Sequence, residues 1–264
     1  MRHQRSPWHS LRPGLIGVAF ESVGTVSGLR RPTSGALVLA YHDVVSVRAA
    51  SEPFAVTPSD LARQLRTLRT WGWTFVRLSE LVERLRSAEE ADGLAAVTFD
   101  DGQVGLLHLG VPVLTELAVP ATVFVVAGAL GTRPAWTATG RALMDEADLR
   151  QCLNAGLDVG CHSLDHLSLP DLGSADLWTQ THTARERLED VTGQPVRHFA
   201  YPFGHRDTRT RDITAAAGFS AAFSFSRGRC RKGGDLYDLP RVDMARAPDR
   251  ARLAYQISRS AKPS

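Results

Sequence analysis

Two short segments of the chain carry side chains that could do chemistry together. In the first, Asp100 and Asp101 stand side by side after an apolar run and before Gly102. Adjacent carboxylates repel each other, and a strand end favours such a pair chiefly where a cation compensates the charge. A turn in which aspartate bonds the backbone and glycine takes a positive φ explains the same letters. The acidic pair alone therefore leaves both interpretations open.

The second segment has the letters CHSLDH and places His162 and His166 four residues apart, again after an apolar run. If a helical turn begins here, both imidazoles project from one face and can bind one metal ion. Histidine pairs with this spacing are also common on surfaces without a metal. Two histidines and one carboxylate, however, are the three protein ligands of a catalytic metal that keeps a position open. One aspartate would then be a ligand, and the other would be free to accept a proton.

The elements that must position these segments alternate in type along the chain. Short apolar, β-branched runs alternate with amphipathic segments, as expected when parallel strands are joined by crossover helices. We predict an α/β fold, a distorted (β/α) barrel of about seven parallel strands, with both segments at the same rim. Residues 239–244 are expected to return to this barrel as a last strand. The seven predicted strands are 36–41, 74–77, 95–99, 121–126, 157–161, 198–201 and 221–225.

Helix boundaries are indicated by capping residues and glycines. Thr57 is a plausible N-cap of a helix that Gly72 ends, and Ser79 is expected to cap a second helix. Two further helices, over residues 174–192 and 208–217, are each followed by a glycine, which adopts a left-handed cap at little cost.

Length and composition indicate one domain. With 264 residues, 43% of them hydrophobic, the chain can bury one sizeable core. We expect a loosely attached N-terminal segment over 1–35, a catalytic barrel over 36–250 and a C-terminal tail over 251–264. Long loops inside a compact domain are more often functional than idle. Three connections of this kind are predicted, over residues 43–56, 128–143 and 226–238.

Charge and cysteine content exclude several classes of protein. The net charge of +3 comes from 31 basic and 28 acidic residues, which is too mild to indicate nucleic-acid binding. Three cysteines do not make a disulfide framework. No run of about 18 apolar residues predicts a transmembrane helix. The apolar run over residues 15–20 is shorter than a signal-peptide core, so we expect a cytoplasmic protein, with a cell-surface or secreted location as the alternative.

The letters TFDDG followed by HSxxH closely resemble the motifs of the polysaccharide deacetylase family, carbohydrate esterase family four, and the resemblance extends over residues 36–244. It implies the barrel fold, with Asp100 as the catalytic base and Asp101, His162 and His166 as the metal ligands. The metal in that family is usually zinc, although cobalt, nickel or iron also suits such a ligand set.

Residues 199–204, FAYPFG, resemble the third family motif, which usually contains an arginine. This chain has Ala200 at that position, so the cation that usually orients the base is missing. Arg241 or another basic residue could compensate. The resemblance also implies that the backbone amide of Tyr201 helps to hold the oxyanion, since a backbone donor survives side-chain replacement.

Residues 39–44, LAYHDV, resemble a subgroup that deacetylates poly-N-acetylglucosamine and carries its acid near the N-terminus. His42 is therefore the candidate general acid, because no histidine follows His205 in the chain. Asp43 could orient the His42 ring. Asp243 could position His42 or a nearby cation.

The resemblance implies a hydrolase of carbon–nitrogen bonds that removes N-acetyl groups from an amino sugar or glycan and releases acetate and a free amine. The predicted partner is a carbohydrate, and the sequence identifies no protein partner. One alternative is a deacetylase or deformylase of a small, nucleotide-linked or lipid-linked amino sugar. A second is a catalytically silent glycan-binding barrel, which the missing arginine and the unusual Gln103 after TFDDG would suit.

Overall fold

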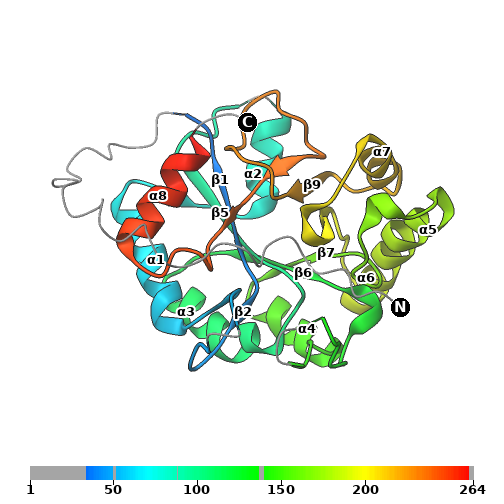
Figure 1. Cartoon of the computed structure of the whole chain (residues 1–264), viewed down its shortest axis with the longest axis horizontal. Helices are drawn as coiled ribbons and strands as arrows, with labels where there is room; N and C mark the ends of the chain where they lie inside the picture. Colours follow the sequence, from blue (N-terminus) through cyan, green and yellow to red (C-terminus); the bar gives the residue numbers. More distant parts are fainter. Residues whose placement is uncertain (1–33, 50–51, 88, 137–139, 262–264) are drawn as a thin grey trace.

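The computed structural model describes most of the chain. The described residues are 34–49, 52–87, 89–136 and 140–261. Residues 1–33 of the predicted N-terminal segment and residues 262–264 of the predicted tail lie outside them. Strands occupy the centre of the molecule and helices surround them (Figure 1).

The seven predicted strands are all present and belong to one parallel sheet. Its strands are β1 (Leu37–Tyr41), β4 (Thr74–Phe75), β5 (Leu94–Phe99), β6 (Ala121–Val125), β7 (Asp158–Cys161), β8 (His198–Ala200), β9 (Ala221–Ser224), β10 (Leu239–Pro240) and β11 (Val242–Asp243). Their order is β10, β9, β8, β7, β6, β5, β1 and β11, and β4 pairs with β5 off this path. The carboxyl ends of these strands therefore meet at one rim of the sheet.

The sheet closes through the segment predicted as a returning strand. Leu239 in β10 pairs with Phe223 in β9, whereas Val242 in β11 pairs with Leu39 in β1. Arg241 alone separates β10 from β11. One extended segment thus joins the two ends of the sheet into a nearly closed barrel, as predicted.

The helices agree with the predicted pattern. They are α1 (Pro58–Thr70), α2 (Leu78–Arg86), α3 (Val111–Glu116), α4 (Glu146–Asn154), α5 (Ser174–Trp178), α6 (Ala184–Thr192), α7 (Thr208–Ala216) and α8 (Arg250–Ser260). The Thr57 hydroxyl accepts the Asp60 N–H at 3.1 Å and so caps α1. A π-helical turn over Thr179–Thr183 connects α5 to α6, and Gly193 ends α6 with a φ of 66°. Residues 174–192 are therefore helical throughout, as predicted.

The start of α2 differs from the prediction. Its N-cap is Arg77, which makes no side-chain capping bond, and Ser79 lies inside the first turn. The helix begins early because Leu78 is buried in the core, and that burial outweighs the preference of a hydroxyl for the cap position. The first turn of α2 is consequently left without a side-chain cap.

Alternate residues of β1 face opposite sides of the sheet. Leu37, Leu39 and Tyr41 belong to the large core between the sheet and the surrounding helices. Val38 belongs to a smaller core that includes Phe124 and Phe223 of the strands together with the buried leucines of α2. Helix α2 therefore packs against the inner face of the barrel.

The predicted loose C-terminal tail is wrong for residues 251–260, which belong to α8. This helix lies beside α1 (Figure 1). Asp249 caps it, and Leu253 and Ile257 are buried in the large core. The four-residue spacing of these two side chains places them on one helix face. In the part of the chain that the structure describes, no helix is long and apolar enough to cross a bilayer.

We expect Leu253→Ala to lower the free energy of unfolding by about 2–5 kcal/mol, because it opens a cavity under α8. Arg252→Ala is the matched control on the exposed face of the same helix and should change stability by less than about 0.5 kcal/mol. Urea unfolding of both variants checks this. Equal effects would contradict the docking of α8 on the core.

Candidate active site

The acidic pair and the histidines meet at the carboxyl rim of the barrel. Asp100 follows β5, His162 follows β7 and His42 follows β1. Strand β6 lies between β5 and β7, and β1 is the neighbour of β5 on its other side. Three of these four consecutive strands thus supply one site, as the strand-end positions of the motifs predicted.

The histidine segment is not the helical turn that its spacing suggested. Ser163 and His166 both have left-handed backbones, with φ values of 67° and 56°. The Ser163 hydroxyl accepts the His166 N–H at 3.0 Å, which stabilises this folded loop. The two imidazoles approach each other because the loop turns back, with ring centroids 5.0 Å apart.

Asp101, His162 and His166 form the candidate metal centre. Their ligand atoms all lie within 4.8 Å of one another. Asp101 Oδ1 is 3.6 Å from His162 Nε2 and 3.4 Å from His166 Nε2. Asp101 has a φ of 70°, a backbone strain of the kind found at functional sites. The three residues predicted as ligands are therefore brought together.

The hydrogen bonds of this centre fit a cation. His162 Nδ1 lies 2.7 Å from the Ala200 carbonyl, which can only accept, so Nδ1 carries the proton and Nε2 presents a lone pair. Burial lowers the pKa of His162 and of His166 to about 4, despite the opposing charge of Asp100, so both rings are neutral at pH 7. Asp101 Oδ1 is buried without a hydrogen-bond partner. An unpartnered carboxylate oxygen thus faces the Nε2 lone pair of His162 and the neutral ring of His166, which is a set of groups that fits a divalent metal.

Asp100 is held by Arg241. Two parallel hydrogen bonds of 2.6 and 2.8 Å join the guanidinium to both carboxylate oxygens, and both side chains are buried. The guanidinium also lies 4.7 Å from the ring centroid of Phe225. Burial by itself raises the pKa of Asp100, but the charge and hydrogen bonds of Arg241, together with the charges of His162 and His42, hold that pKa below its usual range. Arg241 therefore provides the cation that Ala200 does not.

His42 lies at the same rim of the barrel. Its ring lies between Phe54, at a centroid distance of 5.0 Å, and Phe225, at 6.5 Å. His42 Nδ1 is buried without a hydrogen-bond partner. Burial has the largest effect on the pKa of His166, and the charge of Asp100 has the second largest. The charge of His42 comes next and lowers that pKa. Its imidazole is accordingly close to the candidate metal centre.

The two carboxylates considered as supports of His42 both pair with arginines, which for Asp243 corresponds to the alternative prediction of a nearby cation. Asp43 forms an ion pair with Arg141 at 3.1 Å, and Asp243 forms one with Arg246 at 2.9 Å. Among the described residues, neither carboxylate has a hydrogen bond or ion pair with His42. The prediction fails for Asp43 because successive side chains of an extended strand point to opposite faces.

The assignment of Tyr201 is also corrected. Its backbone N–H donates to the Phe223 carbonyl at 3.0 Å, and its hydroxyl donates to the Tyr237 carbonyl at 2.9 Å. The backbone N–H that remains free to donate belongs to Phe203, two residues further along the chain. Phe203 has a left-handed backbone, with a φ of 59°, and its ring lies 4.7 Å from the His166 ring. Within the described chain, no acceptor bonds the Phe203 N–H. The flanking proline and glycine were the turn signal for this residue.

Three exposed aromatic side chains surround the centre. Trp136 stacks on His166 at 5.2 Å, Phe203 meets the same ring edge-on, and Phe54 lies against His42. Their exposed fractions are 39% for Trp136, 53% for Phe203 and 43% for Phe54. Sequence reasoning missed this set, although Phe54 and Trp136 belong to two of the long connections predicted to be functional.

Comparisons with known proteins agree with this fold and site. The polysaccharide deacetylase family pattern matches residues 87–222. YxkH of Bacillus subtilis, provisionally named a polysaccharide deacetylase, is 20% identical over 206 residues, or 78% of this chain and 70% of YxkH. The chitooligosaccharide deacetylase of Azorhizobium caulinodans is 29% identical over 125 residues, or 46% of this chain and 53% of that protein. The structure of IcaB from Ammonifex degensii is similar with a TM-score of 0.71 and 26% identity, covering 80% of this chain and 92% of that chain.

The barrel and its strand-end acids and histidines define a hydrolase of carbon–nitrogen bonds. Because the family pattern covers more than half of the sequence, the chain belongs to the polysaccharide deacetylase family. Deacetylation of N-acetylated sugars is the reaction class of this family.

We expect Arg241→Gln to destabilise the protein by about 3–5 kcal/mol, because it leaves the Asp100 carboxylate buried and unpaired. Asp100→Asn in the same background should recover much of this loss. A double-mutant cycle by urea unfolding measures the coupling. Arg84→Gln is the control, since it breaks an exposed pair with Glu80 and should cost about 0.5 kcal/mol or less. A coupling near zero would contradict the buried pair.

Stability should depend on the ionisation of Asp43. Burial raises its pKa to about 6, although the charge of Arg141 lowers it. In the folded protein Asp43 therefore keeps its proton up to about pH 6, whereas in the unfolded chain it loses the proton near pH 4. The free energy of unfolding consequently declines as pH rises from about 4 to 6.

We therefore expect Asp43→Asn to gain stability relative to the parent protein over that range, by about 1.4 kcal/mol for each pKa unit of the shift. Urea unfolding at several pH values measures the difference. Asp60→Asn should show the opposite sign, because hydrogen bonds from Arg63 and Thr57 outweigh burial and lower the pKa of Asp60. A difference for Asp43→Asn that is independent of pH would contradict the assignment.

Proposed function

We propose that this protein is a metal-dependent deacetylase that removes acetyl groups from N-acetylglucosamine units of a glycan. The observation that carries the proposal is the convergence of Asp101, His162 and His166 beside the Asp100–Arg241 pair. This arrangement combines a candidate cation site with an ionised carboxylate, and metal-assisted amide hydrolysis uses both.

Asp101, His162 and His166 would hold the metal, and zinc is the ion we propose. Zinc binds imidazole and carboxylate ligands readily, and cobalt, nickel or iron suits the same set. When bound, the ion supplies Lewis-acid polarisation of the acyl oxygen and makes water easier to deprotonate. Gln103 Nε2 lies 3.4 Å from Asp101 Oδ2, which leaves Oδ1 of that carboxylate to face the imidazoles.

Asp100 is the proposed general base. Its lowered pKa keeps it ionised, and Arg241 fixes its position by bonding both oxygens. It takes the proton of the attacking water. The Phe203 N–H then donates to the oxygen of the tetrahedral intermediate, a contribution that a preorganised backbone donor makes well.

His42 is the proposed general acid. The departing sugar amine is a poor leaving group until it is protonated, and His42 is close enough to this site to influence the pKa of Asp100. The neighbouring Phe54 and Phe225 rings restrict the orientation of the imidazole.

The exposed aromatic rings support a carbohydrate substrate. Phe54, Trp136 and Phe203 present apolar faces beside the imidazoles, and the apolar face of a pyranose ring can stack on such surfaces. The similarity to a chitooligosaccharide deacetylase and the YHDV segment favour N-acetylglucosamine oligomers. The silent glycan-binding alternative loses its main motivation, because Arg241 replaces the missing arginine.

We expect Asp101→Ala, His162→Ala and His166→Ala each to lose stoichiometric metal and acetate release together. Elemental analysis and an acetate assay measure the two properties. His182→Ala is the control, since His182 pairs with Glu186 on a helix surface. Full metal content in all three ligand variants would refute the ligand set.

We expect His42→Ala to retain metal while its kcat falls by about 10²- to 10⁴-fold, the usual contribution of a general acid. The substrate series should comprise N-acetylglucosamine oligomers and small acylated amino sugars. Unchanged turnover would remove His42 from the mechanism. Acetate release only from the small sugars would favour the small-molecule alternative.

A further inference from the structure

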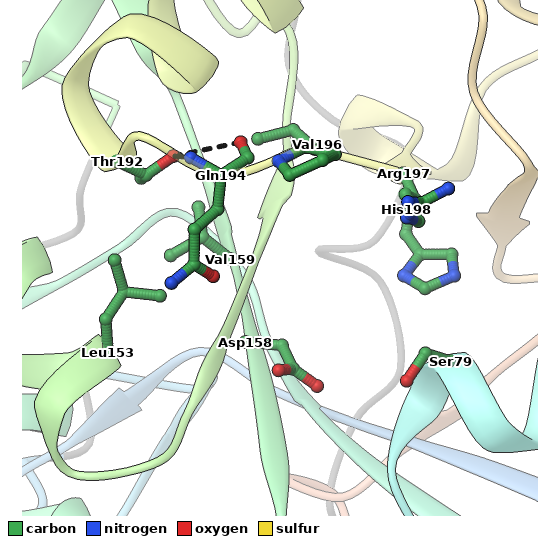
Figure 2. Close-up of a pocket in the computed structure, with 10 residues that line it drawn as sticks. Ser79, Leu153, Asp158, Val159, Thr192, Gln194, Val196, Arg197 and His198 are labelled. Carbon is green, nitrogen blue, oxygen red and sulfur yellow. Dashed lines mark hydrogen bonds between the residues drawn. The ribbon is translucent and has the colours of Figure 1, made fainter.

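A cavity lies at the opposite rim of the barrel (Figure 2). Its volume is about 220 Å³. Asp158 and His198 line it, and they are the first residues of β7 and β8. Ser79, in the first turn of α2, lines another side. The proposed deacetylase site follows the carboxyl ends of the strands, so this cavity is separate from it.

His198 is a buried side chain that faces this cavity without a partner. Only 6% of the residue is exposed. In the part of the chain covered by the structure, its ring nitrogens make no hydrogen bond, and its contact is with the ring of Phe223. Figure 2 shows His198 and Ser79 around the same opening, with Asp158 nearby. A buried imidazole that lacks a protein partner is a binding group for whatever enters the cavity.

Ser79, in the uncapped first turn of α2, lines the same cavity. The backbone N–H groups of Leu78, Ser79 and Glu80 precede the first intrahelical bond, which Leu81 donates to Arg77. Among the described residues, none of these three groups has an acceptor, and the Ser79 hydroxyl has none either. A helix N-terminus with free N–H groups carries partial positive charge and binds anions.

The surrounding charges also favour an anion. Arg197 lines the cavity, and its guanidinium has no ion pair within the described residues. The Asp158 carboxylate is already paired with Arg77 at 3.0 Å. Glu80, also in the first turn of α2, is paired with Arg84 at 3.1 Å. Burial, together with the charges of Arg197 and Arg86, lowers the pKa of His198 to about 4, so its ring is neutral at pH 7 and carries one N–H.

We propose that this cavity is a binding site for a small oxyanion, a phosphate or a carboxylate. The α2 N–H groups, the Ser79 hydroxyl and a ring N–H of His198 donate to the anion, and Arg197 supplies charge at the entrance. The site is independent of the metal centre and does not require the deacetylase reaction.

The test is titration of the full-length protein with inorganic phosphate and, separately, with acetate, at constant ionic strength. Isothermal titration calorimetry gives the affinity, and the imidazole NMR signal of His198 reports occupancy of the cavity. We expect saturable binding of at least one anion, with a shift of that signal. Binding of phosphate alone identifies a phosphate site, and binding of acetate alone identifies a carboxylate site.

Ser79→Asp is the decisive variant. Aspartate in the first turn stabilises a helix, so α2 should remain folded, while the new carboxylate repels the anion. We expect Ser79→Asp to abolish binding and His198→Gln to weaken it about tenfold, the effect of one charge-assisted hydrogen bond. Arg252→Ala on α8 is the control. Absence of saturable binding, or unchanged affinity in Ser79→Asp, would overturn the proposal. Deacetylase activity should be the same in all of these variants.

Discussion

The ion pair between Asp100 and Arg241 connects the closure of the barrel to the chemistry of its rim. Arg241 lies between β10 and β11, the two segments that join the ends of the sheet. A guanidinium buried at this junction requires a carboxylate, and Asp100 at the end of β5 provides it with both oxygens. The strands that close the barrel therefore also hold the proposed base ionised and in place.

The candidate metal centre has a complementary constraint. Asp101 Oδ1 is buried without a hydrogen-bond partner and faces the Nε2 lone pair of His162, an unfavourable arrangement that a cation would relieve. Asp101, Ser163, His166 and Phe203 all have left-handed backbones around this centre. Strain of this kind persists where the surrounding structure enforces it, and it concentrates here at the rim where the catalytic groups meet.

The two ends of the barrel are occupied differently. At the carboxyl rim, charged and aromatic side chains surround the proposed substrate site. At the amino rim, α2 packs its leucines into the inner core and leaves its first turn facing a polar cavity. The burial of Leu78 explains both features, because it starts the helix at a residue that has no capping side chain before it.

The sequence by itself determined the alternation of strands and helices, the strand-end positions of Asp100, Asp101, His42 and His162, and the candidate metal ligands, because these follow from local periodicity and short motifs. Tertiary structure alone decided that Arg241, 141 positions from Asp100, pairs with it, and that Asp43 turns to Arg141 instead of His42.

The fold was also needed to identify the Phe203 amide, and not that of Tyr201, as the free backbone donor. It was needed as well to show that α8 packs on the core. Pairing between strands distant in sequence commits the Tyr201 N–H, and packing against α1 and the large core holds α8 in place. Motif spacing carries no information about such contacts, since they depend on which elements become neighbours when the sheet closes.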